Sequence, residues 1–306
     1  MSKTAIVFPG QGSQYVGMGK DIYEKHSLAK EMFLQADSIV GYSLSTICFE
    51  GPEDILRQTK HTQPAIVLHS IVLSKFLSHI PFAVTAGHSV GEYAALVYAG
   101  VLSFEDGLQL VQLRGELMQK AGEINRGTMA AIVGLDAVIV EQVCNDATDA
   151  GIVQCANFNS PGQIVISGSV GGVKKAMGIA KERGAKLVKE LVVSGAFHSP
   201  LMQPAYDGLH NALADIKFSD ARIPVYANVN AQPVTKASEI RSLLEQQILA
   251  PVRWEESVKK MCDDNATYFV EVGPGKVLQG LIKRINPNAQ IFGVDKEQEI
   301  NGLTIQ

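Results

Sequence analysis

A serine between two glycines is the strongest sign of chemistry in this chain. The motif Gly87-His88-Ser89-Val90-Gly91 follows a short apolar segment at residues 81–86 and precedes a helix-forming segment at residues 92–99. This order predicts a buried strand, a sharp turn and a helix, the nucleophile-elbow arrangement that presents a serine hydroxyl above an α/β sheet. The start of the helix would direct backbone N–H groups towards an oxyanion formed on the target of the serine. The alternative is an ordinary helix-capping serine that happens to lie between two glycines.

A serine hydroxyl is a poor nucleophile unless a neighbouring base takes its proton. Among the seven histidines, His198 is the favoured base, because Ser199 and Pro200 after it match an N-cap and a first helical residue. His198 would then lie on a connection before a helix, at the predicted cleft between two domains, where ligand sites tend to form. His88 is the rival base, although a residue next to the nucleophile on an elbow usually points away from it. A histidine that merely occupies a loop is the remaining alternative.

Gln11 is a candidate oxyanion donor. It lies in Gly10-Gln11-Gly12-Ser13-Gln14, directly after the predicted first strand. Loops that follow strands in α/β folds line the binding crevice, so Gln11 could offer its backbone N–H or its side-chain amide there. One such donor is typically worth about 10²–10³ in rate. A phosphate-binding loop is the alternative, but the spacing matches neither the dinucleotide-binding nor the P-loop pattern.

Arg114 is the most informative single charge. A helix is predicted from the N-cap Ser103 to about Ala121, and Arg114 falls in the middle of its apolar side. That side is formed by Leu110, Val111, Leu113, Leu117 and Met118. A buried guanidinium must find an anion or several acceptors, and its fork suits a carboxylate. The partner is either a carboxylate of the protein itself or, if the pocket binds substrate, a carboxylate of the substrate.

The elements that must position these residues alternate between strand-like and helix-like segments almost throughout, which predicts an α/β fold with a mainly parallel sheet. One region departs from that alternation. It contains predicted strands at 128–135, 152–156, 163–167 and 186–193, predicted helices at 137–150 and 170–183, and turn residues at 157–162. The β-α-β-β-α-β order is the ferredoxin-like pattern. We therefore predict a large α/β-hydrolase-like catalytic domain, residues 1–126 and 198–306, with a small ferredoxin-like domain, residues 127–197, inserted into it.

Composition narrows the class of protein. The chain has 306 residues, of which 46% are hydrophobic and 19% charged, as expected for a globular protein with an ample core. A net charge of -4 argues against nucleic acid as the main partner. No apolar run is long enough to span a bilayer, the start of the chain lacks a signal-peptide layout, and the four cysteines are scattered, so a cytoplasmic protein is expected. Histidines, cysteines and carboxylates show no metal-ligand spacing, so no metal is expected.

Taken together, these motifs closely resemble those of the malonyl-CoA:acyl carrier protein transacylases. The resemblance covers nearly the whole chain. It rests on residues 8–14, 87–93, 114–115, 196–200, 228–229, 251–254 and 271–275, that is FPGQGSQ, GHSVGEY, RG, AFHSP, NV, PVRW and EVGPG. One departure is Val90, where the family commonly has leucine. Because the role at that position belongs to a backbone N–H, the departure puts little in doubt.

The resemblance implies a role for each candidate. Ser89 would be the nucleophile and His198 its base. The family orients this histidine through a backbone carbonyl, which maps here to Gln247, instead of through an acidic residue. The other implied roles are the backbone amides of Gln11 and Val90 as oxyanion hole, Arg114 as the group that binds the malonyl carboxylate, and His88, Asn159 and Phe197 as pocket lining. The Ala196-Phe197 pair is like that of malonyl-selective members of the family.

The activity implied is transfer of a malonyl group from malonyl-CoA to the phosphopantetheine thiol of holo acyl carrier protein, for fatty-acid synthesis. A malonyl-serine ester would be the intermediate, with no metal or redox cofactor, and a monomer is expected. Carrier proteins of this system are acidic, so basic residues near the cleft are docking candidates: Lys181, Arg183, Lys186, Lys189, Lys276, Lys283 and Arg284. The alternatives are a serine thioesterase or esterase, a non-enzymatic acyltransferase-like carrier, and a transacylase of a polyketide pathway.

Overall fold

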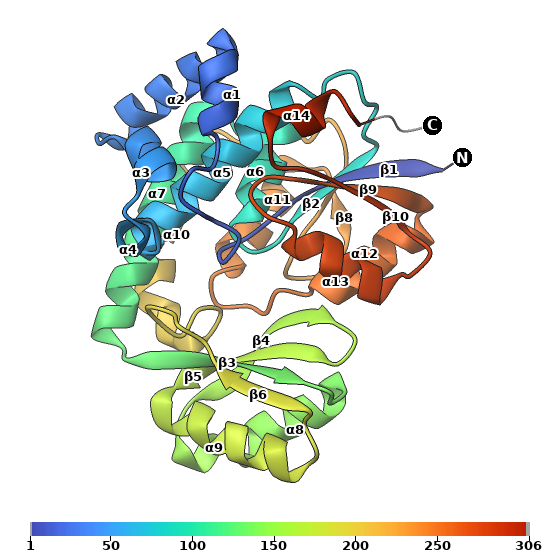
Figure 1. Cartoon of the computed structure of the whole chain (residues 1–306). Helices are drawn as coiled ribbons and strands as arrows, with labels where there is room; N and C mark the ends of the chain where they lie inside the picture. The colour runs from blue at the N-terminus through green and yellow to red at the C-terminus, as the bar shows by residue number, and fades with distance from the viewer. Residues whose placement is uncertain (1, 304–306) are drawn as a thin grey trace.

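The structure, a computed structural model, describes residues 2–303 and contains two β-sheets (Figure 1). The larger sheet has six strands in the order β10-β9-β1-β2-β7-β8. These are β1 (Lys3–Phe8), β2 (Val84–Gly87), β7 (Val225–Tyr226), β8 (Pro233–Val234), β9 (Ala266–Val272) and β10 (Gln290–Val294). Every neighbouring pair is parallel except β7 and β8. The predicted alternation of strands and helices therefore gives a mainly parallel sheet.

Helices cover both faces of this sheet, and the central strand shows why. Ile6 and Phe8 of β1 pack into one hydrophobic cluster, while Ala5 and Val7 pack into another on the opposite face. A strand buried on both faces must be apolar at every position, unlike a strand with one face in water. The helices of this large unit are α1 (Lys20–Lys25), α2 (Ser27–Val40), α3 (Leu44–Glu50), α4 (Glu53–Leu56), α5 (Thr59–Lys75), α6 (Gly91–Tyr98), α7 (Phe104–Ile124), α10 (Gln203–Asp215), α11 (Ala237–Gln246), α12 (Trp254–Asp263), α13 (Val277–Ile285) and α14 (Glu297–Ile300).

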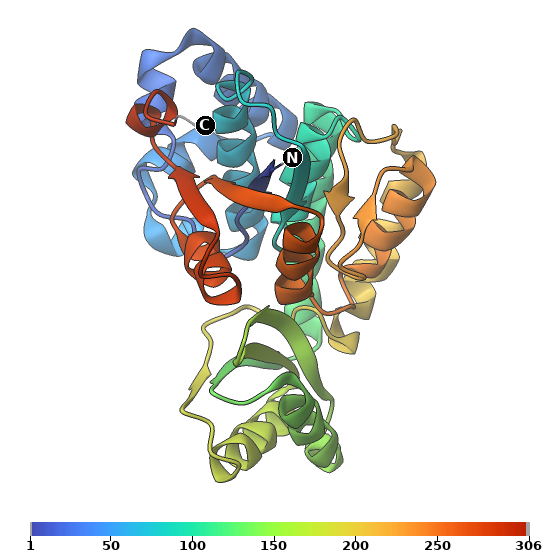
Figure 2. The same ribbon diagram turned by 90° about the vertical axis from the view of Figure 1, so that its right-hand side faces the viewer.

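The second sheet is antiparallel and forms a small unit with two helices. Its strand order is β4-β5-β3-β6, and its elements follow each other as β3 (Gly127–Val133), α8 (Ala137–Asp146), β4 (Val153–Ser160), β5 (Gln163–Ser169), α9 (Val170–Glu182) and β6 (Leu187–Glu190). Figure 2 shows α8 and α9 on the face of this sheet that points away from the large unit. The helices bury one face of the sheet in a separate hydrophobic cluster. The opposite face is left towards the large unit.

One sequence-based expectation in this unit is wrong. Residues 157–160 were expected in a turn because they are rich in turn-forming types, yet β4 continues through them to Ser160 and only Pro161 and Gly162 turn. The reason is pairing with two partners, because residues 157–160 pair with β5 and a distant segment pairs with β4 as well. The N–H of Phe158 donates to the carbonyl of Val252, and the N–H of Val252 donates to the carbonyl of Ala156. The segment around Val252 thus adds a strand-like partner to β4, which overrides the local turn preference.

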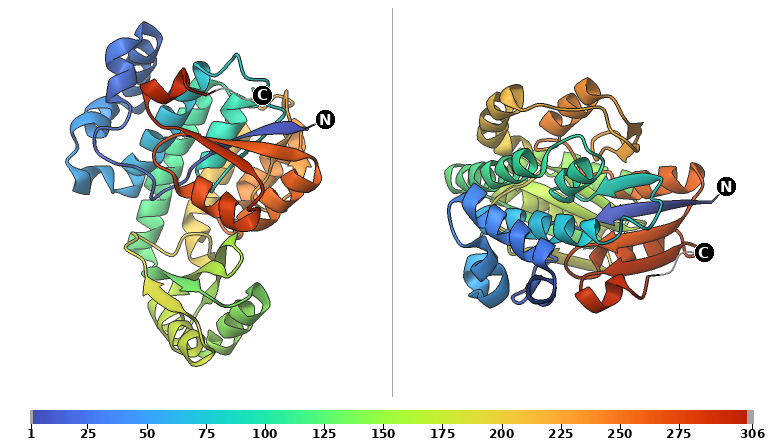
Figure 3. Two further views of the ribbon diagram at one scale, coloured as in Figure 1. Left: turned by 45° about the vertical axis from the view of Figure 1, so that its right-hand side comes forward. Right: turned by 90° about the horizontal axis from the view of Figure 1, so that it is seen from above.

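The two units meet where the candidate residues are expected. The register pairs Phe8 of β1 with Gly87 of β2, so the loops that follow both strands leave the same edge of the parallel sheet. The small unit lies across that edge, below the large unit in the left view of Figure 3. No helix within residues 2–303 is long and apolar enough to cross a membrane. The domain boundaries at 126/127 and 197/198 stay a prediction, and residues 1 and 304–306 of the predicted large domain lie outside the described residues.

Candidate active site

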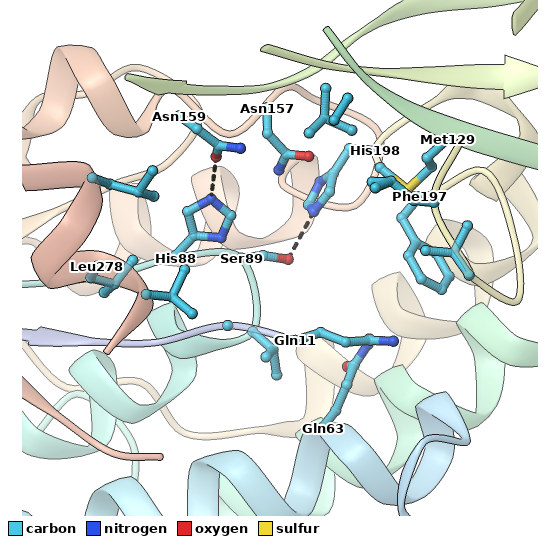
Figure 4. A pocket seen from close by; sticks show the side chains of 18 of the residues that line it. Gln11, Gln63, His88, Ser89, Met129, Asn157, Asn159, Phe197, His198 and Leu278 are labelled. Carbon is cyan, nitrogen blue, oxygen red and sulfur yellow. Dashed lines mark hydrogen bonds between the residues drawn. The ribbon is translucent and has the colours of Figure 1, made fainter. Parts of the chain in front are cut away.

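A cavity of about 300 Å³ lies between the two units and collects most of the predicted site residues. The predicted residues that line it are Gln11, His88, Ser89, Val90, Arg114, Asn159, Phe197 and His198. Gln247 does not line it but makes hydrogen-bond contacts with three of them, Ser89, Arg114 and His198. Residues more than 180 positions apart in the chain thus meet in one place, as Figure 4 shows for Gln11, Ser89 and His198.

The elbow folds sharply because both glycines stand where a side chain would collide with backbone. A Cβ on Gly87 would come within 2.0 Å of the carbonyl of Gly91, and one on Gly91 would come within 2.3 Å of the carbonyl oxygen of Phe8. Between them Ser89 has φ of 52°, in the left-handed region that non-glycine residues rarely adopt. Such strain is characteristic of functional positions, where the surrounding structure enforces it. The glycines therefore serve the close packing of β2, α6 and β1 that presents Ser89.

Ser89 and His198 are in hydrogen-bond contact. The distance from Ser89 Oγ to His198 Nε2 is 2.8 Å. On the other side of the ring, His198 Nδ1 faces two carbonyl oxygens, that of Gln247 at 2.9 Å and that of Ala250 at 3.1 Å. Because a carbonyl only accepts, Nδ1 carries the proton and Nε2 presents its lone pair to the serine hydroxyl. Two carbonyls therefore fix the tautomer that a general base requires.

Burial and the positive charge of Arg114 lower the pKa of His198 to about 3. His198 is only 2% exposed, so a charged imidazolium would be poorly solvated in the resting site. The histidine is accordingly neutral over the physiological range. A neutral imidazole is the form that accepts a proton from Ser89.

His88, the rival base, points elsewhere. Its Nε2 lies 2.9 Å from Oδ1 of Asn159, on β4, and Figure 4 shows the ring turned away from the Ser89 hydroxyl. Burial lowers the pKa of His88 as well. The pair joins the elbow of the large unit to the small unit across the cavity, as lining residues do.

Two backbone amides are available for an oxyanion. The N–H of Ser89 is already engaged, because it donates to Oδ1 of Asn228 at 2.7 Å. The amides of Val90 and Gln11 make no hydrogen bond within the described part of the chain, and both residues line the cavity beside Ser89. Gln11 and Val90 therefore supply free donors next to Ser89, one from the loop after each of the parallel strands β1 and β2.

Arg114 is fully buried, and its hydrogen-bond partners are neutral. Its terminal nitrogens donate to Oε1 of Gln63 at 2.7 Å, to Oε1 of Gln247 at 3.0 Å and to Oγ of Ser89 at 3.2 Å. Its Nε has no hydrogen-bond partner in residues 2–303, and no carboxylate there lies within ion-pair distance of it. The alternative of an ion pair with a protein carboxylate is therefore absent from the described structure. A buried cation with an unused N–H beside Ser89 suits an anionic group brought by a ligand.

Comparison with known proteins decides the family. A model described as acyl transferase domain matches residues 5–298. A malonyl CoA-acyl carrier protein transacylase of Bacillus subtilis is 47% identical over 100% of this chain and 97% of its own length. A crystal structure of an acyl carrier protein S-malonyltransferase from Vibrio cholerae superposes with a TM-score of 0.95 at 42% identity, covering 99% of this chain and 100% of that one. The chain belongs to the malonyl-CoA:acyl carrier protein transacylase family.

One further structure of this family bears on the partner. A malonyl transacylase solved in complex with a holo acyl carrier protein of a type II polyketide system is 38% identical, with a TM-score of 0.95 and 98% coverage of both chains. This relative, which shares the fold, thus binds a carrier protein. Within residues 2–303 of the present chain, no cluster of three or more histidine, cysteine or carboxylate side chains could hold a metal ion.

Sequence analysis missed several residues that the site of this family member uses. Asn228 holds the N–H of Ser89, Gln63 holds Arg114, and the side chain of Gln247, rather than only its carbonyl, contacts Arg114. Glu92 accepts hydrogen bonds from the side chain of Gln247 and the backbone of Asn228. The available signal was a polar residue within an apolar segment, and only Glu92 of α6 gave it, because Gln63 stands in the polar first turns of α5. Their partners are too distant in sequence to be inferred.

Proposed function

We propose that this chain transfers a malonyl group from malonyl-CoA to the phosphopantetheine thiol of acyl carrier protein, through an ester on Ser89. The observation that carries this function is the placement of a fully buried arginine, with an unused Nε, beside a serine–histidine pair in one cavity. A serine–histidine pair alone serves many acyl groups. The unpaired cation restricts the acyl group to one with a carboxylate, in agreement with the family.

The first half-reaction loads the serine. Ser89 Oγ attacks the thioester carbonyl of malonyl-CoA while its proton passes to His198 Nε2. The amides of Gln11 and Val90 donate to the oxygen as it becomes an oxyanion. The tetrahedral intermediate then collapses, the carbon–sulfur bond breaks, and His198 returns the proton to the departing CoA thiolate. The product is a malonyl ester of Ser89 and free CoA.

The second half-reaction reverses these roles with a different thiol. The phosphopantetheine thiol of the carrier protein gives its proton to His198 and attacks the ester carbonyl. The carbon–oxygen bond to Ser89 breaks, and the serine recovers the proton from His198. One thioester is exchanged for another, so the bond chemistry is balanced without a redox partner.

Acyl selectivity follows from Arg114. Its guanidinium donates to Ser89 Oγ in the resting site and would hold the malonyl carboxylate through its free hydrogens when the ester forms. Phe197, buried at the wall of the cavity, would limit branching next to the thioester carbonyl. An uncharged acyl group would leave the cation without an anion, which disfavours simple esters as substrates.

Intact mass spectrometry tests the transfer. Malonyl-CoA should add one malonyl mass to the wild type and none to Ser89→Ala, and holo carrier protein should remove it much faster than water does. Arg114→Ala should load malonyl and acetyl groups with similar rates, whereas the wild type prefers malonyl. Equal discharge by water and carrier protein would favour the thioesterase alternative, and an unchanged malonyl preference in Arg114→Ala would refute the role of Arg114.

The finer features of the protein are proposed on similar grounds. The small unit is ferredoxin-like, supported by its strand order β4-β5-β3-β6, and the large unit is α/β-hydrolase-like, supported by its elbow between β2 and α6. We place the enzyme in fatty-acid synthesis as a cytoplasmic monomer without a cofactor. Size-exclusion chromatography tests the monomer, and comparison of fatty-acid with polyketide carrier proteins tests the pathway.

A further inference from the structure

Glu92 is a buried carboxylate close to Ser89 in the chain. The proposed mechanism gives it no role. It lies three residues after Ser89, in the first turn of α6, and is 2% exposed. Burying a carboxylate in an apolar helix costs stability unless hydrogen bonds compensate for lost water. One of its oxygens, Oε2, accepts two such bonds. Both come from residues that touch the catalytic groups.

The first bond runs through Gln247 to Arg114. Gln247 Nε2 donates to Glu92 Oε2 at 2.7 Å and to the carbonyl of Ser89 at 3.0 Å, and its Oε1 accepts from Arg114 at 3.0 Å. Because a carboxylate can only accept, Glu92 fixes which end of this amide faces the arginine. A flipped amide would place its NH₂ group against the guanidinium. Gln247 also supplies the carbonyl that faces His198 Nδ1, so its placement affects both groups.

The second bond runs through Asn228 to the elbow. The N–H of Asn228 donates to Glu92 Oε2 at 3.2 Å. The side chain of Asn228 then spans the turn, accepting from the N–H of Ser89 at 2.7 Å and donating to the carbonyl of Gly87 at 2.7 Å. These bonds occupy the amide of Ser89 and leave those of Val90 and Gln11 for the oxyanion. Oε2 of Glu92 thus accepts a hydrogen bond from each of the two residues, Gln247 and Asn228, that contact the site.

Charge gives Glu92 a second effect. Its negative charge attracts the positive charge of the buried Arg114. The side-chain amide of Gln247 lies between the two groups, so they form no direct ion pair. A direct pair would occupy the guanidinium and compete with a substrate carboxylate. A carboxylate one residue removed offsets part of the buried positive charge and leaves the Nε–H of Arg114 without a partner among residues 2–303.

We propose that Glu92 is a positioning residue that orients Gln247 and Asn228 and, as the remote counter-charge of Arg114, sets how strongly the cavity binds the carboxylate of the acyl group. The inference rests on the roles proposed above for Arg114 and Gln247. An ionised Glu92 weakens the attraction between Arg114 and a malonyl group, and a neutral Glu92 strengthens it.

The protonation state of Glu92 changes near neutrality. Burial raises the pKa of Glu92 to about 7, opposed by the hydrogen bonds from Gln247 and Asn228 and by the charge of Arg114. The titratable groups that interact with it are Arg114 on α7 and its neighbour Tyr93, whose own pKa is raised by burial to about 12. His198 is neutral over this range, since burial lowers its pKa to about 3, and burial lowers the pKa of His88 as well. Arg114 therefore faces a counter-charge above pH 7 and none below it.

Two substitutions separate position from charge. Glu92→Gln keeps an oxygen that accepts from Gln247 and Asn228 but removes the negative charge, whereas Glu92→Ala removes both. The matched control is Asp295→Asn, which neutralises a buried carboxylate that accepts from Tyr15 and does not line the cavity. Initial rates of Ser89 loading would be measured with malonyl-CoA and acetyl-CoA across pH, together with Tm for every variant.

In the wild type, the KM for malonyl-CoA should rise by about tenfold between about pH 6 and about pH 8.5, while the KM for acetyl-CoA stays constant. Glu92→Gln should match the wild type near pH 6 and keep its low malonyl-CoA KM at high pH. Glu92→Ala should lose about 10² in kcat with both acyl groups, because Ser89 and His198 are no longer held. Asp295→Asn should retain the wild-type pH profile.

A malonyl-CoA KM in Glu92→Gln that rises with pH as in the wild type would overturn the role of the charge. Full kcat in a folded Glu92→Ala would overturn the positioning role. If Glu92→Ala does not fold, the pH profile of Glu92→Gln still decides the role of the charge. Arg114→Ala separates this failure from that of the proposed function: it loses malonyl preference if the function holds, whatever the Glu92 variants do.

Discussion

Two residues at the centre of the site share an unusual backbone conformation. Ser89 and His198 have φ of 52° and 55°, and neither is glycine. Left-handed backbone costs a non-glycine residue of order 1–3 kcal/mol, so neighbouring contacts must enforce it. For Ser89 these are the hydrogen bonds of Asn228 and the close packing of Gly87 and Gly91. For His198 they include the hydrogen bond from the side chain of Gln154 to its carbonyl. The strain at both residues brings Oγ and Nε2 together.

The proposed role of His198 as base leads to a prediction for the rate of Ser89 loading. Replacing it by alanine should slow Ser89 loading by about 10²–10⁴, because no other base faces the hydroxyl. With its pKa lowered to about 3, His198 stays unprotonated far below its ordinary range. The wild-type loading rate at saturating malonyl-CoA should therefore not fall between about pH 8 and about pH 5 through protonation of a histidine of ordinary pKa. Rapid-quench measurement of the acyl-enzyme checks both statements.

A His198 with an ordinary pKa would give a different pH dependence of the loading rate. A loading rate that drops tenfold per pH unit below about 6.5 would mean that His198 titrates normally and that its burial is relieved in solution. His88→Ala is the matched control, since its ring faces Asn159 and not the serine. The His88→Ala substitution should change the rate of Ser89 acylation far less than His198→Ala does.

At the scale of elements, the turn between β2 and α6 depends on backbone contact that only glycine allows. Gly91→Ala would place a methyl group 2.3 Å from the carbonyl oxygen of Phe8 and 2.6 Å from that of Pro9, which cannot move without shifting β1. We expect a loss of about 1–3 kcal/mol in the free energy of unfolding, with impaired loading of Ser89. Urea denaturation together with the loading rate measures both effects.

Gly178→Ala is the matched control for that substitution. Gly178 lies in α9, and a Cβ there would meet nothing within 4 Å. Alanine should stabilise this helix by about 0.5–1 kcal/mol, because it restricts the unfolded chain more than glycine does. Equal effects of the two substitutions would show that the close approach at Gly91 is relaxed in solution.

Some of the helices and strands could be predicted from the sequence, and others could not. The alternation of strands and helices, the elbow and the helix that carries Arg114 were predictable, because each depends on local periodicity, glycine or capping. Ser103 caps α7 as expected, accepting from the N–H of Asp106. The extension of β4 through residues 157–160 was not predictable from turn propensity, since these residues pair with β5 across a two-residue turn and also with Val252, almost a hundred residues later. Local propensity cannot reveal a distant partner.

The residues of the site also divide into those that could be predicted from the sequence and those that could not. Ser89 and Arg114 stood out because their residue types conflict with their surroundings, a serine in a glycine turn and a charge on an apolar face. Gln11 and His198 stood out by position, one directly after the first predicted strand and the other just before a predicted helix at the domain cleft. Asn228 and the side chain of Gln247 act by holding backbone and amide groups, for which many residue types appear suitable in sequence. Their roles depend on the distance to Glu92, which only the fold determines.

At the scale of the whole molecule, the cavity exists because the two units face each other. The large unit contributes the elbow and Arg114, while the small unit contributes Asn159 and the apolar wall at Met129 and Val165. Arg284 of α13 also bonds Gln163 of β5 across this junction. A ligand must therefore reach Ser89 between the units, where the long phosphopantetheine arm of a carrier protein would enter. The surface around that entrance is where a carrier protein would dock.

Charge around the entrance leads to the last prediction. All seven basic docking candidates are exposed, but Lys181 and Arg183 belong to the end of α9, on the face of the small sheet that points away from the large unit. Lys276, by contrast, directly precedes Val277, Leu278 and Leu281, which line the cavity. If an acidic carrier protein docks there, raising salt from about 0.1 M to about 1 M shortens the Debye length from about 10 Å to about 3 Å and weakens the encounter. Discharge of the malonyl-enzyme by carrier protein should slow markedly, while its hydrolysis by water stays constant.

Charge reversal locates the effect. Lys276→Glu should raise the KM for carrier protein by about tenfold without changing the rate of hydrolysis, because it adds repulsion at the entrance and leaves Ser89 and His198 untouched. Lys20→Glu, an equal change of charge on α1 far from the cavity lining, is the matched control and should leave that KM near the wild-type value. Discharge rates that ignore salt, or equal effects of the two substitutions, would show that the carrier protein docks without the help of this basic surface.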